Sequence, residues 1–382
     1  MYSGVVDVEG REVRWETTFD ESIKFKCTNC GYCCTSSNVE ISKDEILGIK
    51  GLGKKSFTEE FVNEEHENST RIKNTDKDPC LFLNEKKLCN VYEHRPSVCR
   101  LYPFKLVPVS DGLVKIDTTY SCKSMLTKHF SKENEVDFGE IVKTFLSHPF
   151  GKHQQYQSGI LHEAVKEHLD KDSATSQCWE SIISEIHSME LFEQTWDLMS
   201  SFEKTREQKE ILKKSDAHEY ISRALEHYKS NKLPINPSYS DDFFYGSHQR
   251  PYQSMDLSTN KVYYFRIKEG NVIFIDGKNE KNYPLESITK KSLSPEAKDF
   301  LADYLRKLWG RQLTKQKIEQ KVYESRGTIP SFSIQLDVAK KKFMLLGFFM
   351  DAIAHNREDN LITMKDAQEA VLPFDLIFCY LR

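Results

Sequence analysis

The 382-residue sequence lacks, at its start, the basic and apolar stretch that directs a protein to secretion. It also lacks an apolar run of the roughly 18 to 20 residues needed to cross a bilayer, since the most apolar segment, residues 343–354, is interrupted by Asp351. Positive charge is not in excess either, because 54 Lys and Arg oppose 58 Asp and Glu. We therefore expect a cytoplasmic protein with no membrane association and no general affinity for nucleic acid.

Several enzyme motifs are missing as well. The sequence contains neither the His-Glu-x-x-His motif of zinc proteases nor the Gly-x-Ser-x-Gly motif of hydrolases. It has no Cys-x-x-x-Cys-x-x-Cys spacing of the radical enzymes and no glycine-rich strand-turn-helix signature for S-adenosylmethionine. Histidines are frequent between His148 and His187, but their spacing forms no recognisable site, so the catalytic residues stay unassigned.

What the sequence does contain is a dense group of cysteines. Four fall within eight residues and four more follow by residue 122, whereas the remaining 260 residues carry only Cys178 and Cys379, predicted to be buried free thiols. In a reducing compartment such a group is more typical of metal-binding thiolates than of disulfides, which are the minor alternative. The eight predicted metal ligands are Cys27, Cys30, Cys33, Cys34, Cys80, Cys89, Cys99 and Cys122.

The spacing of the first cysteines favours iron and sulfide. Cys27-x-x-Cys30-x-x-Cys33 repeats a step in which intervening amides fold under two sulfurs that converge on one centre. Zinc sites usually show one such pair and, after a loop, a second pair, so zinc is the alternative. Cys33 and Cys34 are adjacent, and neighbouring side chains of an extended chain point to opposite sides. We expect one or two iron-sulfur clusters of the 4Fe-4S type, with the division of the ligands left open.

Two arginines beside the downstream cysteines are predicted to contact the cofactor. Arg95 and Arg100 would be costly to bury without an anionic partner, and a thiolate-bound cluster is such a partner. Pairing with Glu93 or Asp78 is an equally good interpretation. His94 is interpreted as a surface or hydrogen-bonding histidine rather than as a ligand.

The order of patterns along the chain predicts an α+β fold. A small, loop-rich cysteine-cluster domain begins with a hairpin that turns at Glu9-Gly10. A mainly helical region follows, and a short antiparallel β element then precedes further helices at about 294–313, 334–356 and 363–381. The predicted domains are 1–130, with the metal cluster; 131–235, which is helical; and 236–382, which is α+β with a hairpin at 261–275.

Aromatic residues concentrate in the predicted hairpin. Tyr263 and Phe274 lie there beside Arg266, a mixture that can stack nucleobases on a sheet. The same mixture is typical of a sheet face packed against helices with its charges outward, which is the interpretation that ordinary burial preferences favour. We therefore predict a packed sheet here.

The cysteine motifs carry a family resemblance. Cys-x-x-Cys-Gly-x-Cys-Cys, Cys-x-Phe-Leu and Arg-Pro-x-x-Cys-Arg-x-Tyr-Pro-Phe follow in this order over residues 25–125. This segment resembles the CxxCxxCC cysteine-cluster family of zinc- or iron-chelating domains, and bacterial flagellin lysine N-methylases carry a similar domain. The resemblance implies metal binding by the eight cysteines. For the methylase relatives it further implies an iron-sulfur cluster and S-adenosylmethionine as the methyl donor.

The leading hypothesis is a cytoplasmic iron-sulfur protein whose remaining residues present a protein substrate or partner. Its activity would be redox or protein-modifying, including lysine methyl transfer, so the enzyme classes considered are an iron-sulfur oxidoreductase and an S-adenosylmethionine-dependent protein methyltransferase. The alternative is a structural zinc protein that acts as a protein-interaction module.

Overall fold

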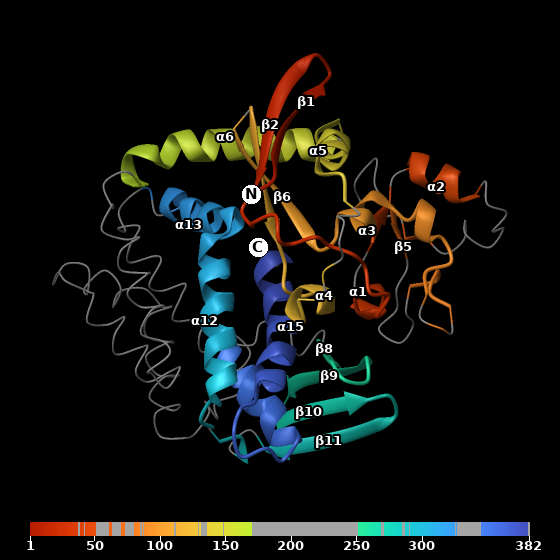
Figure 1. Cartoon of the computed structure of the whole chain (residues 1–382), viewed down its shortest axis with the longest axis vertical. Helices are drawn as coiled ribbons and strands as arrows, with labels where there is room; N and C mark the ends of the chain where they lie inside the picture. Colours follow the sequence, from red (N-terminus) through yellow and green to blue (C-terminus); the bar gives the residue numbers. More distant parts are fainter. Residues whose placement is uncertain are drawn as a thin grey trace.

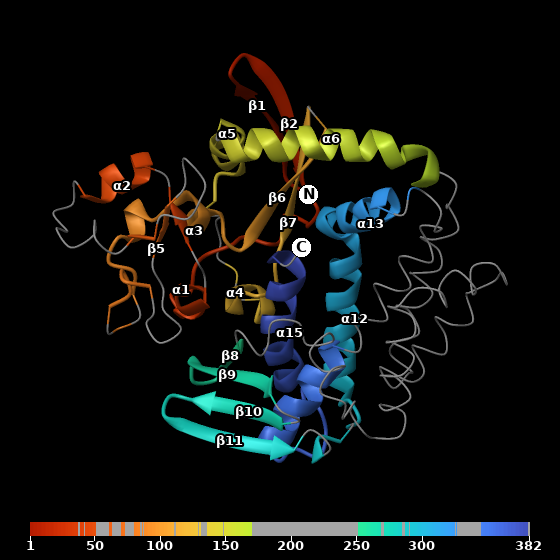
Figure 2. The ribbon, with the colours of Figure 1, turned by 180° about the vertical axis from the view of Figure 1, so that it is seen from behind.

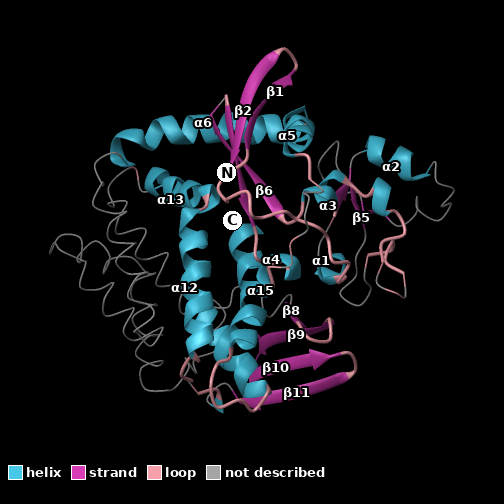
Figure 3. Cartoon of the chain, in the orientation of Figure 1, coloured by secondary structure: helices cyan, strands magenta, loops and turns pink. Residues whose placement is uncertain are grey.

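The computed structural model has the α+β architecture that the sequence predicts (Figure 1). Its described strands form three sheets with helices beside them (Figure 3). No helix in the described part of the chain combines the length and the apolar character that a bilayer span requires. The structure describes residues 1–36, 39–41, 43–50, 61–62, 70–72, 80–84, 86, 88–110, 112–128, 130, 136–147, 149–169, 251–268, 271–284, 287–289, 291–324, 326 and 345–380.

The first sheet joins the start of the chain to two strands that lie between Cys99 and Cys122. Its order is β1-β2-β7-β6, with β2 and β7 parallel and the other neighbours antiparallel. Glu9 and Gly10 have positive φ values of 56° and 81°, and the predicted hairpin turn at this dipeptide is confirmed. The strands are β1 Ser3–Val8, β2 Arg11–Thr17, β6 Phe104–Ser110 and β7 Leu113–Thr118.

Two helices, α5 (Phe138–Ser147) and α6 (Pro149–Leu169), pack against the first sheet (Figure 1). The ring of Phe138 contacts those of Trp15 and Phe104, with ring centroids 5.9 and 5.0 Å away. These contacts bury the apolar side of α5 against the strands. The helices predicted for 131–235 are thus present as far as Leu169, and residues 170–235 lie outside the described residues.

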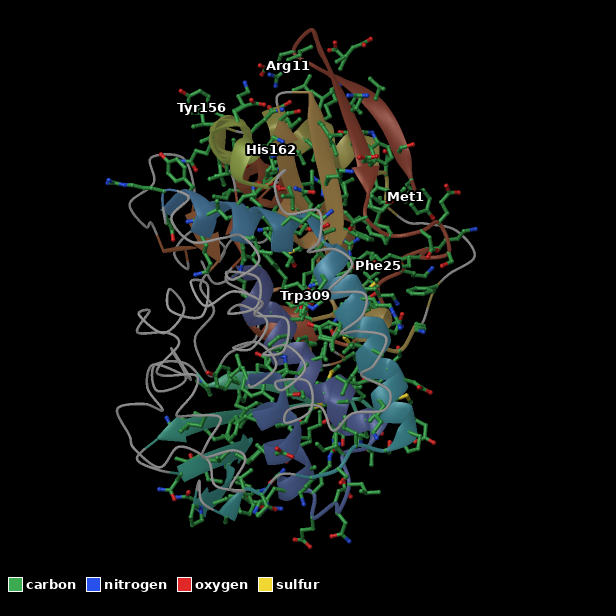
Figure 4. All side chains as sticks on the ribbon, turned by 90° about the vertical axis from the view of Figure 1, so that its left-hand side faces the viewer. Met1, Arg11, Phe25, Tyr156, His162 and Trp309 are labelled. Carbon is green, nitrogen blue, oxygen red and sulfur yellow. The ribbon has the colours of Figure 1, made fainter. Side chains whose placement is uncertain are left out.

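Side chains of α6 connect the first sheet to the C-terminal helices. Gln155 accepts a hydrogen bond from Arg11 at 2.8 Å and donates one to the carbonyl oxygen of Ser110 at 3.2 Å. Farther along the helix, Nδ1 of His162 lies 3.3 Å from Oε1 of Glu319 on α13 (Gln312–Glu324; His162 is labelled in Figure 4). Helix α6 therefore contacts the first sheet through Gln155 and helix α13 through His162.

The second sheet is an antiparallel meander of order β11-β10-β9-β8. The predicted hairpin corresponds to its two middle strands, and β8 and β11 extend it on either side. The rings of Tyr252, Phe265 and Phe349 pack together with centroid distances of 4.7 to 5.4 Å, so these aromatic side chains form a packed sheet face, as predicted. The strands are β8 Tyr252–Asp256, β9 Lys261–Lys268, β10 Asn271–Asp276 and β11 Asn279–Pro284.

The prediction of a single helix at about 294–313 is wrong at its C-terminal end, because a first helix ends there and a second one begins. Arg311 is extended, with φ −66° and ψ 140°, and separates them. The carboxylate of Asp117, on β7, accepts the N–H groups of Gln312 and Leu313 at 3.0 and 2.7 Å and so starts the second helix. Within the predicted segment 334–356 the described residues, 345–356, are helical. The remaining helices are α12 Pro295–Gly310, α13 Gln312–Glu324 and α15 Met364–Tyr380.

Replacing Asp117 with alanine is expected to lower the free energy of unfolding by about 2 kcal/mol, since two N–H groups of α13 lose their acceptor. The buried carboxylate also accepts a hydrogen bond from Thr18 Oγ1 at 2.8 Å. Urea denaturation measures the change. A matched control is Ser294→Ala, which removes a single cap hydrogen bond of 3.2 Å from α12. An Asp117→Ala variant no less stable than this control would contradict the capping role.

The cysteine region, residues 26–128, contains short elements and its own small sheet of order β3-β5-β4. Glu45 Oε1 accepts a hydrogen bond from the N–H of Ser97 at 2.6 Å, which joins the helices α2 and α3. The elements outside the first sheet are α1 Tyr32–Ser36, β3 Glu40–Ile41, α2 Lys43–Lys50, β4 Phe61–Val62, β5 Thr70–Ile72, the 3-10 turn η2 Tyr92–His94, α3 Ser97–Leu101 and α4 Lys123–Leu126.

Two hydrophobic cores are in contact with predicted cysteine ligands. The main core runs from Val8 to Phe374 and includes residues from the first sheet, the second sheet and the C-terminal helices. A satellite core lies within the cysteine region and consists of Val39, Ile41, Ile49, Phe82 and Val91. We refer to β8–β11, α12, α13, the helical residues 345–356 and α15 together as the C-terminal module. The predicted division into three domains stays a prediction, and residues on both sides of its boundary at 130 share the main core.

Candidate metal centre

The eight predicted ligands come from several elements of the cysteine region, and all are free thiols. Cys122 is buried and the other seven are half-buried. Cys178 and the side chain of Cys379 lie outside the described residues. Cys27 and Cys30 lie in the loop before α1, Cys33 and Cys34 on α1, Cys80 and Cys89 in the segment before η2, Cys99 on α3 and Cys122 directly before α4.

The opening loop has the backbone shape that a Cys-x-x-Cys step requires. Asn29 and Gly31 both have left-handed conformations, with φ values of 52° and 77°. Asparagine and glycine tolerate this region better than other residues do. The turn brings the N–H of Asn29 to 3.4 Å from the Sγ of Cys27, to which it donates. An amide therefore lies beneath this sulfur, as the spacing predicts.

One group of cysteines packs against the main core. Cys122 belongs to that core, and Cys27 and Cys30 pack against it. Burial raises the pKa of Cys122 to about 12, and the neighbouring Cys30 and Cys27 raise it further, whereas its hydrogen bonds to backbone amides oppose the rise. Cys30 and Cys122 also act on the Cys33 thiol. We call Cys27, Cys30, Cys33 and Cys122 the inner set.

A second group packs against the satellite core. Cys80, Cys89 and Cys99 all contact its residues. Burial raises the pKa of Cys80 to about 11, with Cys34 and Cys89 as its charged neighbours, and burial likewise raises the pKa of Cys99 beside Cys80, Cys34 and Cys89. The backbone N–H of Cys80 also donates to the carbonyl oxygen of Cys34 at 2.8 Å. We call Cys34, Cys80, Cys89 and Cys99 the outer set.

Cys33 and Cys34 lie where the two sets adjoin. Both are on α1, so the backbone here is helical and not extended, and successive side chains leave it about 100° apart rather than on opposite sides. A hydrogen bond between the two thiols raises the pKa of Cys33 and lowers that of Cys34. Their remaining neighbours differ in part: Cys30 and Cys122 act on Cys33, whereas Cys34 acts on Cys80 and Cys99 and also on Cys27.

The segment that carries Cys89 is a tight turn. The strand pair predicted for 81–83 and 88–91 is present as a single bridge between Leu83 and Cys89. The N–H of Asn84 donates to the carbonyl oxygen of Leu88 at 2.9 Å, and the N–H of Asn90 to that of Phe82 at 2.8 Å. These bonds hold Cys89 beside the satellite core.

The two arginines predicted to contact a cofactor are placed differently. Arg95 is half-buried, with its guanidinium 4.1 Å from the ring centroid of Tyr92. Its charge acts on thiols of both sets and favours the thiolates of Cys27, Cys34 and Cys99. Arg100 is exposed, and so is His94 at the end of η2. The structure therefore brings Arg95 among the cysteines and leaves Arg100 at the surface.

Sequence reasoning missed the residues of the C-terminal module that contact the cysteine segments. The hydroxyl of Tyr32, next to Cys33, donates to the carbonyl oxygen of Gln253 at 2.8 Å, and Nε2 of Gln253 donates back to the carbonyl oxygen of Tyr32 at 3.1 Å. Near Cys122, the hydroxyl of Thr119 donates to Oδ2 of Asp375 at 2.7 Å. These partners are more than 200 residues away in sequence, so no local pattern could indicate them.

Asp375 is the centre of a buried polar group. It forms an ion pair with Arg311 at 2.6 Å, and the exposed fractions of the two side chains are 0% and 2%. The hydroxyl of Tyr304 donates to Oδ1 at 2.7 Å, and the N–H of Tyr120 donates to Oδ2 at 2.5 Å. The carboxylate therefore has donors from the cysteine region on one side and from α12 and Arg311 on the other.

The donor set fits a soft, thiophilic metal. Thiolates are the ligands that zinc and iron-sulfur clusters prefer. Burial and mutual repulsion favour the neutral thiols of Cys80, Cys99 and Cys122, and a bound cation is the partner that would favour their thiolates. In the part of the chain that is described, no three His, Cys, Asp or Glu side chains form an assembled metal-binding group. The sets are therefore defined by their packing and by their neighbours.

Comparison with known proteins bears on the cysteine region. Residues 26–133 match the family described as "CxxCxxCC: Putative zinc- or iron-chelating domain". Two uncharacterized proteins of Methanocaldococcus jannaschii are similar to the chain. MJ0661 is 28% identical over 165 residues, which cover 39% of this chain and 87% of that protein, and MJ0939 is 26% identical over 158 residues, which cover 40% and 54%.

No solved structure matches the chain. The family match extends over the same segment as the cysteine motifs, from before Cys27 to beyond Cys122. The cysteine region therefore matches the zinc- or iron-chelating family that its sequence resembles, and the match supports a metal-binding protein.

Proposed function

We propose that the chain is an iron-sulfur protein that holds its clusters with two sets of four cysteines. The observation that carries this proposal is that Cys27, Cys30 and Cys122 pack in the main core whereas Cys80, Cys89 and Cys99 pack against the satellite core, with Cys33 and Cys34 adjacent on α1 between them. Four thiolates are the usual ligand number of a 4Fe-4S cluster. The inner set would supply Cys27, Cys30, Cys33 and Cys122, and the outer set Cys34, Cys80, Cys89 and Cys99.

The residues around the sulfurs suit this role. The amide of Asn29 donates to the Cys27 sulfur at 3.4 Å, an interaction that stabilises a thiolate. Arg95 supplies positive charge beside both sets. The two hydrophobic cores exclude water from one side of each set. When bound, a cluster would supply one-electron redox chemistry, so the reaction we propose is electron transfer with a protein as the partner.

The decisive experiment is anaerobic purification followed by analysis of iron, acid-labile sulfide and zinc. Two occupied 4Fe-4S sites would give about eight iron and eight sulfide per chain, and a single site about four of each. Electron paramagnetic resonance of the reduced protein would identify the cluster type. Stoichiometric zinc without sulfide, in protein made under iron-sufficient and oxygen-free conditions, would overturn the proposal.

A structural zinc site is the second candidate, and the satellite core favours it for the outer set. Among the described residues this core has five buried side chains, and a core of that size supplies little stability on its own. A structural zinc ion supplies folding energy in such cases. Removal of zinc with a chelator would then unfold the cysteine region, which circular dichroism would detect. Lysine methyl transfer rests on the family resemblance alone, and mass spectrometry of protein substrates with S-adenosylmethionine would test it.

The thiol pKa values predict opposite pH dependences for the metal-free and the metal-loaded protein. In the metal-free fold burial raises the pKa of Cys80 from 9.0 to about 11. The unfolded chain then loses this proton first, so the metal-free protein should lose stability as the pH rises through this range. In the loaded protein the folded state holds thiolates, so stability should fall as the pH decreases from about 8 to 6. Thermal denaturation of both forms measures the two slopes, and slopes of the same sign would contradict the assignment.

A further inference from the structure

Two of the segments that carry the inner set, those with Cys33 and Cys122, are contacted directly by the C-terminal module. The first is α1, which bears Cys33. Gln253 on β8 is 6% exposed, and its Nε2 donates to the carbonyl oxygen of Tyr32 at 3.1 Å and to the hydroxyl of Thr35 at 2.7 Å. Its carbonyl oxygen accepts the hydroxyl of Tyr32 at 2.8 Å. These three hydrogen bonds fix both the start and the end of one helical turn around Cys33 and Cys34.

The second segment, residues 119–126, bears Cys122. Asp375 accepts hydrogen bonds from Thr119 and Tyr120 on one side of this cysteine. On the other side, Nζ of Lys123 donates to the carbonyl oxygen of Leu257 at 2.7 Å. Every residue from 119 to 122 is buried. The position of Cys122 therefore depends on α15 and on the turn after β8.

Figures 1 and 2 show α1 and α4 beside β8 and α15, whereas α2 and α3 lie farther from the module. Cys34 shares its turn of α1 with Cys33, but the hydrogen bonds described around Cys80 and Cys99, in the rest of the outer set, stay within the cysteine region. They include the bond from Cys80 N–H to Cys34 and the bond from Ser97 N–H to Glu45. The two sets thus differ in what supports them, although they adjoin at α1.

We infer that Gln253 and Asp375 are positioning residues for the inner set, and that metal binding by this set is linked to docking of the C-terminal module. This inference rests on the proposed function. Such a linkage is reciprocal: a module that orders the segments of Cys33 and Cys122 raises the metal affinity of the inner set, and bound metal stabilises docking by the same free energy. Metal-free protein then opens locally at β8 and α15 without unfolding as a whole.

Hydrogen-exchange mass spectrometry of the full chain tests the linkage without any substitution. Protein reconstituted with iron and sulfide under argon is compared with protein that has been stripped by a chelator and kept reduced. Peptides covering 252–257 and 366–375 should exchange about tenfold faster in the stripped protein, whereas β10 and β11 should change little. Equal exchange of these peptides in protein shown to contain metal would overturn the inference and leave the proposed function intact.

A pair of variants tests the positioning role. Gln253→Met keeps the side-chain length and removes two hydrogen bonds to α1, so Zn²⁺ binding to the inner set should weaken about tenfold. The measurement uses a competing chelator in a Cys89→Ser background, in which the outer set lacks a ligand. Tyr283→Phe is the control, because it removes a 3.2 Å hydrogen bond to Asn356 within the module. Equal Zn²⁺ affinities of the Gln253→Met and Tyr283→Phe variants would overturn the positioning role. If neither these variants nor the Cys89→Ser protein bound Zn²⁺, the proposed ligand sets would be overturned as well.

Discussion

Replacing Asp375 with alanine is expected to lower the free energy of unfolding by about 3 to 5 kcal/mol, the cost of leaving a buried charge without its partner. Arg311 is 2% exposed, and its buried guanidinium would lose the ion pair with the Asp375 carboxylate. The hydroxyls of Thr119 and Tyr304 would lose their acceptor as well. Urea denaturation followed by circular dichroism measures the change.

Two controls separate the buried pair from ion pairs in general. Removing both charges, in an Asp375→Ala, Arg311→Met double variant, should recover part of the lost stability because the buried guanidinium is removed together with its carboxylate partner. Asp276→Ala breaks the exposed ion pair with Lys261, in which the side chains are 40% and 62% exposed, and should cost less than about 1 kcal/mol. An Asp375→Ala variant as stable as Asp276→Ala would show that the buried group contributes little.

Replacing Cys33 or Cys34 with serine is expected to remove different metal centres. Cys33→Ser should lose the iron and sulfide of the inner set and keep those of the outer set, and Cys34→Ser should do the reverse. The reason is that Cys30 and Cys122 act on Cys33, whereas Cys34 acts on Cys80 and Cys99 in addition to Cys27. Each variant should retain about half of the iron and sulfide of the unmodified protein.

Iron content alone does not tell which centre is lost, so the second substitution identifies it. Adding Cys122→Ser to Cys33→Ser should change the iron content little, because both residues belong to the inner set. Adding Cys122→Ser to Cys34→Ser should remove the remaining iron. Complete loss of iron in each single variant would instead indicate one multinuclear centre that needs all eight cysteines.

Local patterns were sufficient for the elements whose contacts are close in sequence. Glu9-Gly10 supplies the positive φ values of the first hairpin turn, and the hairpin of β9 and β10 follows from two apolar runs joined by a short turn. The cysteine spacing likewise indicated the family and the metal-binding region. Each turn, hairpin or cysteine motif among these signals is a single short stretch of consecutive residues.

Long-range contacts explain what the sequence did not reveal. Strand β7 pairs in parallel with β2, about 100 residues earlier, and Pro108 with a register shift interrupts the pattern of β6. The end of α12 depends on Asp117, nearly 200 residues away, because that side chain starts a new helix at Gln312. The hydrogen bonds that join Gln253 and Asp375 to the segments carrying Cys33 and Cys122 are likewise contacts between residues more than 200 positions apart. These features need the tertiary structure, since the partners share no local pattern.

The distance in sequence between Thr119 and Asp375, 256 positions, also has a consequence for biosynthesis. A ribosome adds roughly 5 to 20 residues per second, so Asp375 is made roughly 10 to 50 s after the segment that it anchors. During this interval every cysteine of the inner set has been translated, while the carboxylate that holds residues 119 and 120 does not yet exist. The segment that bears Cys122 therefore lacks this anchor until translation reaches α15.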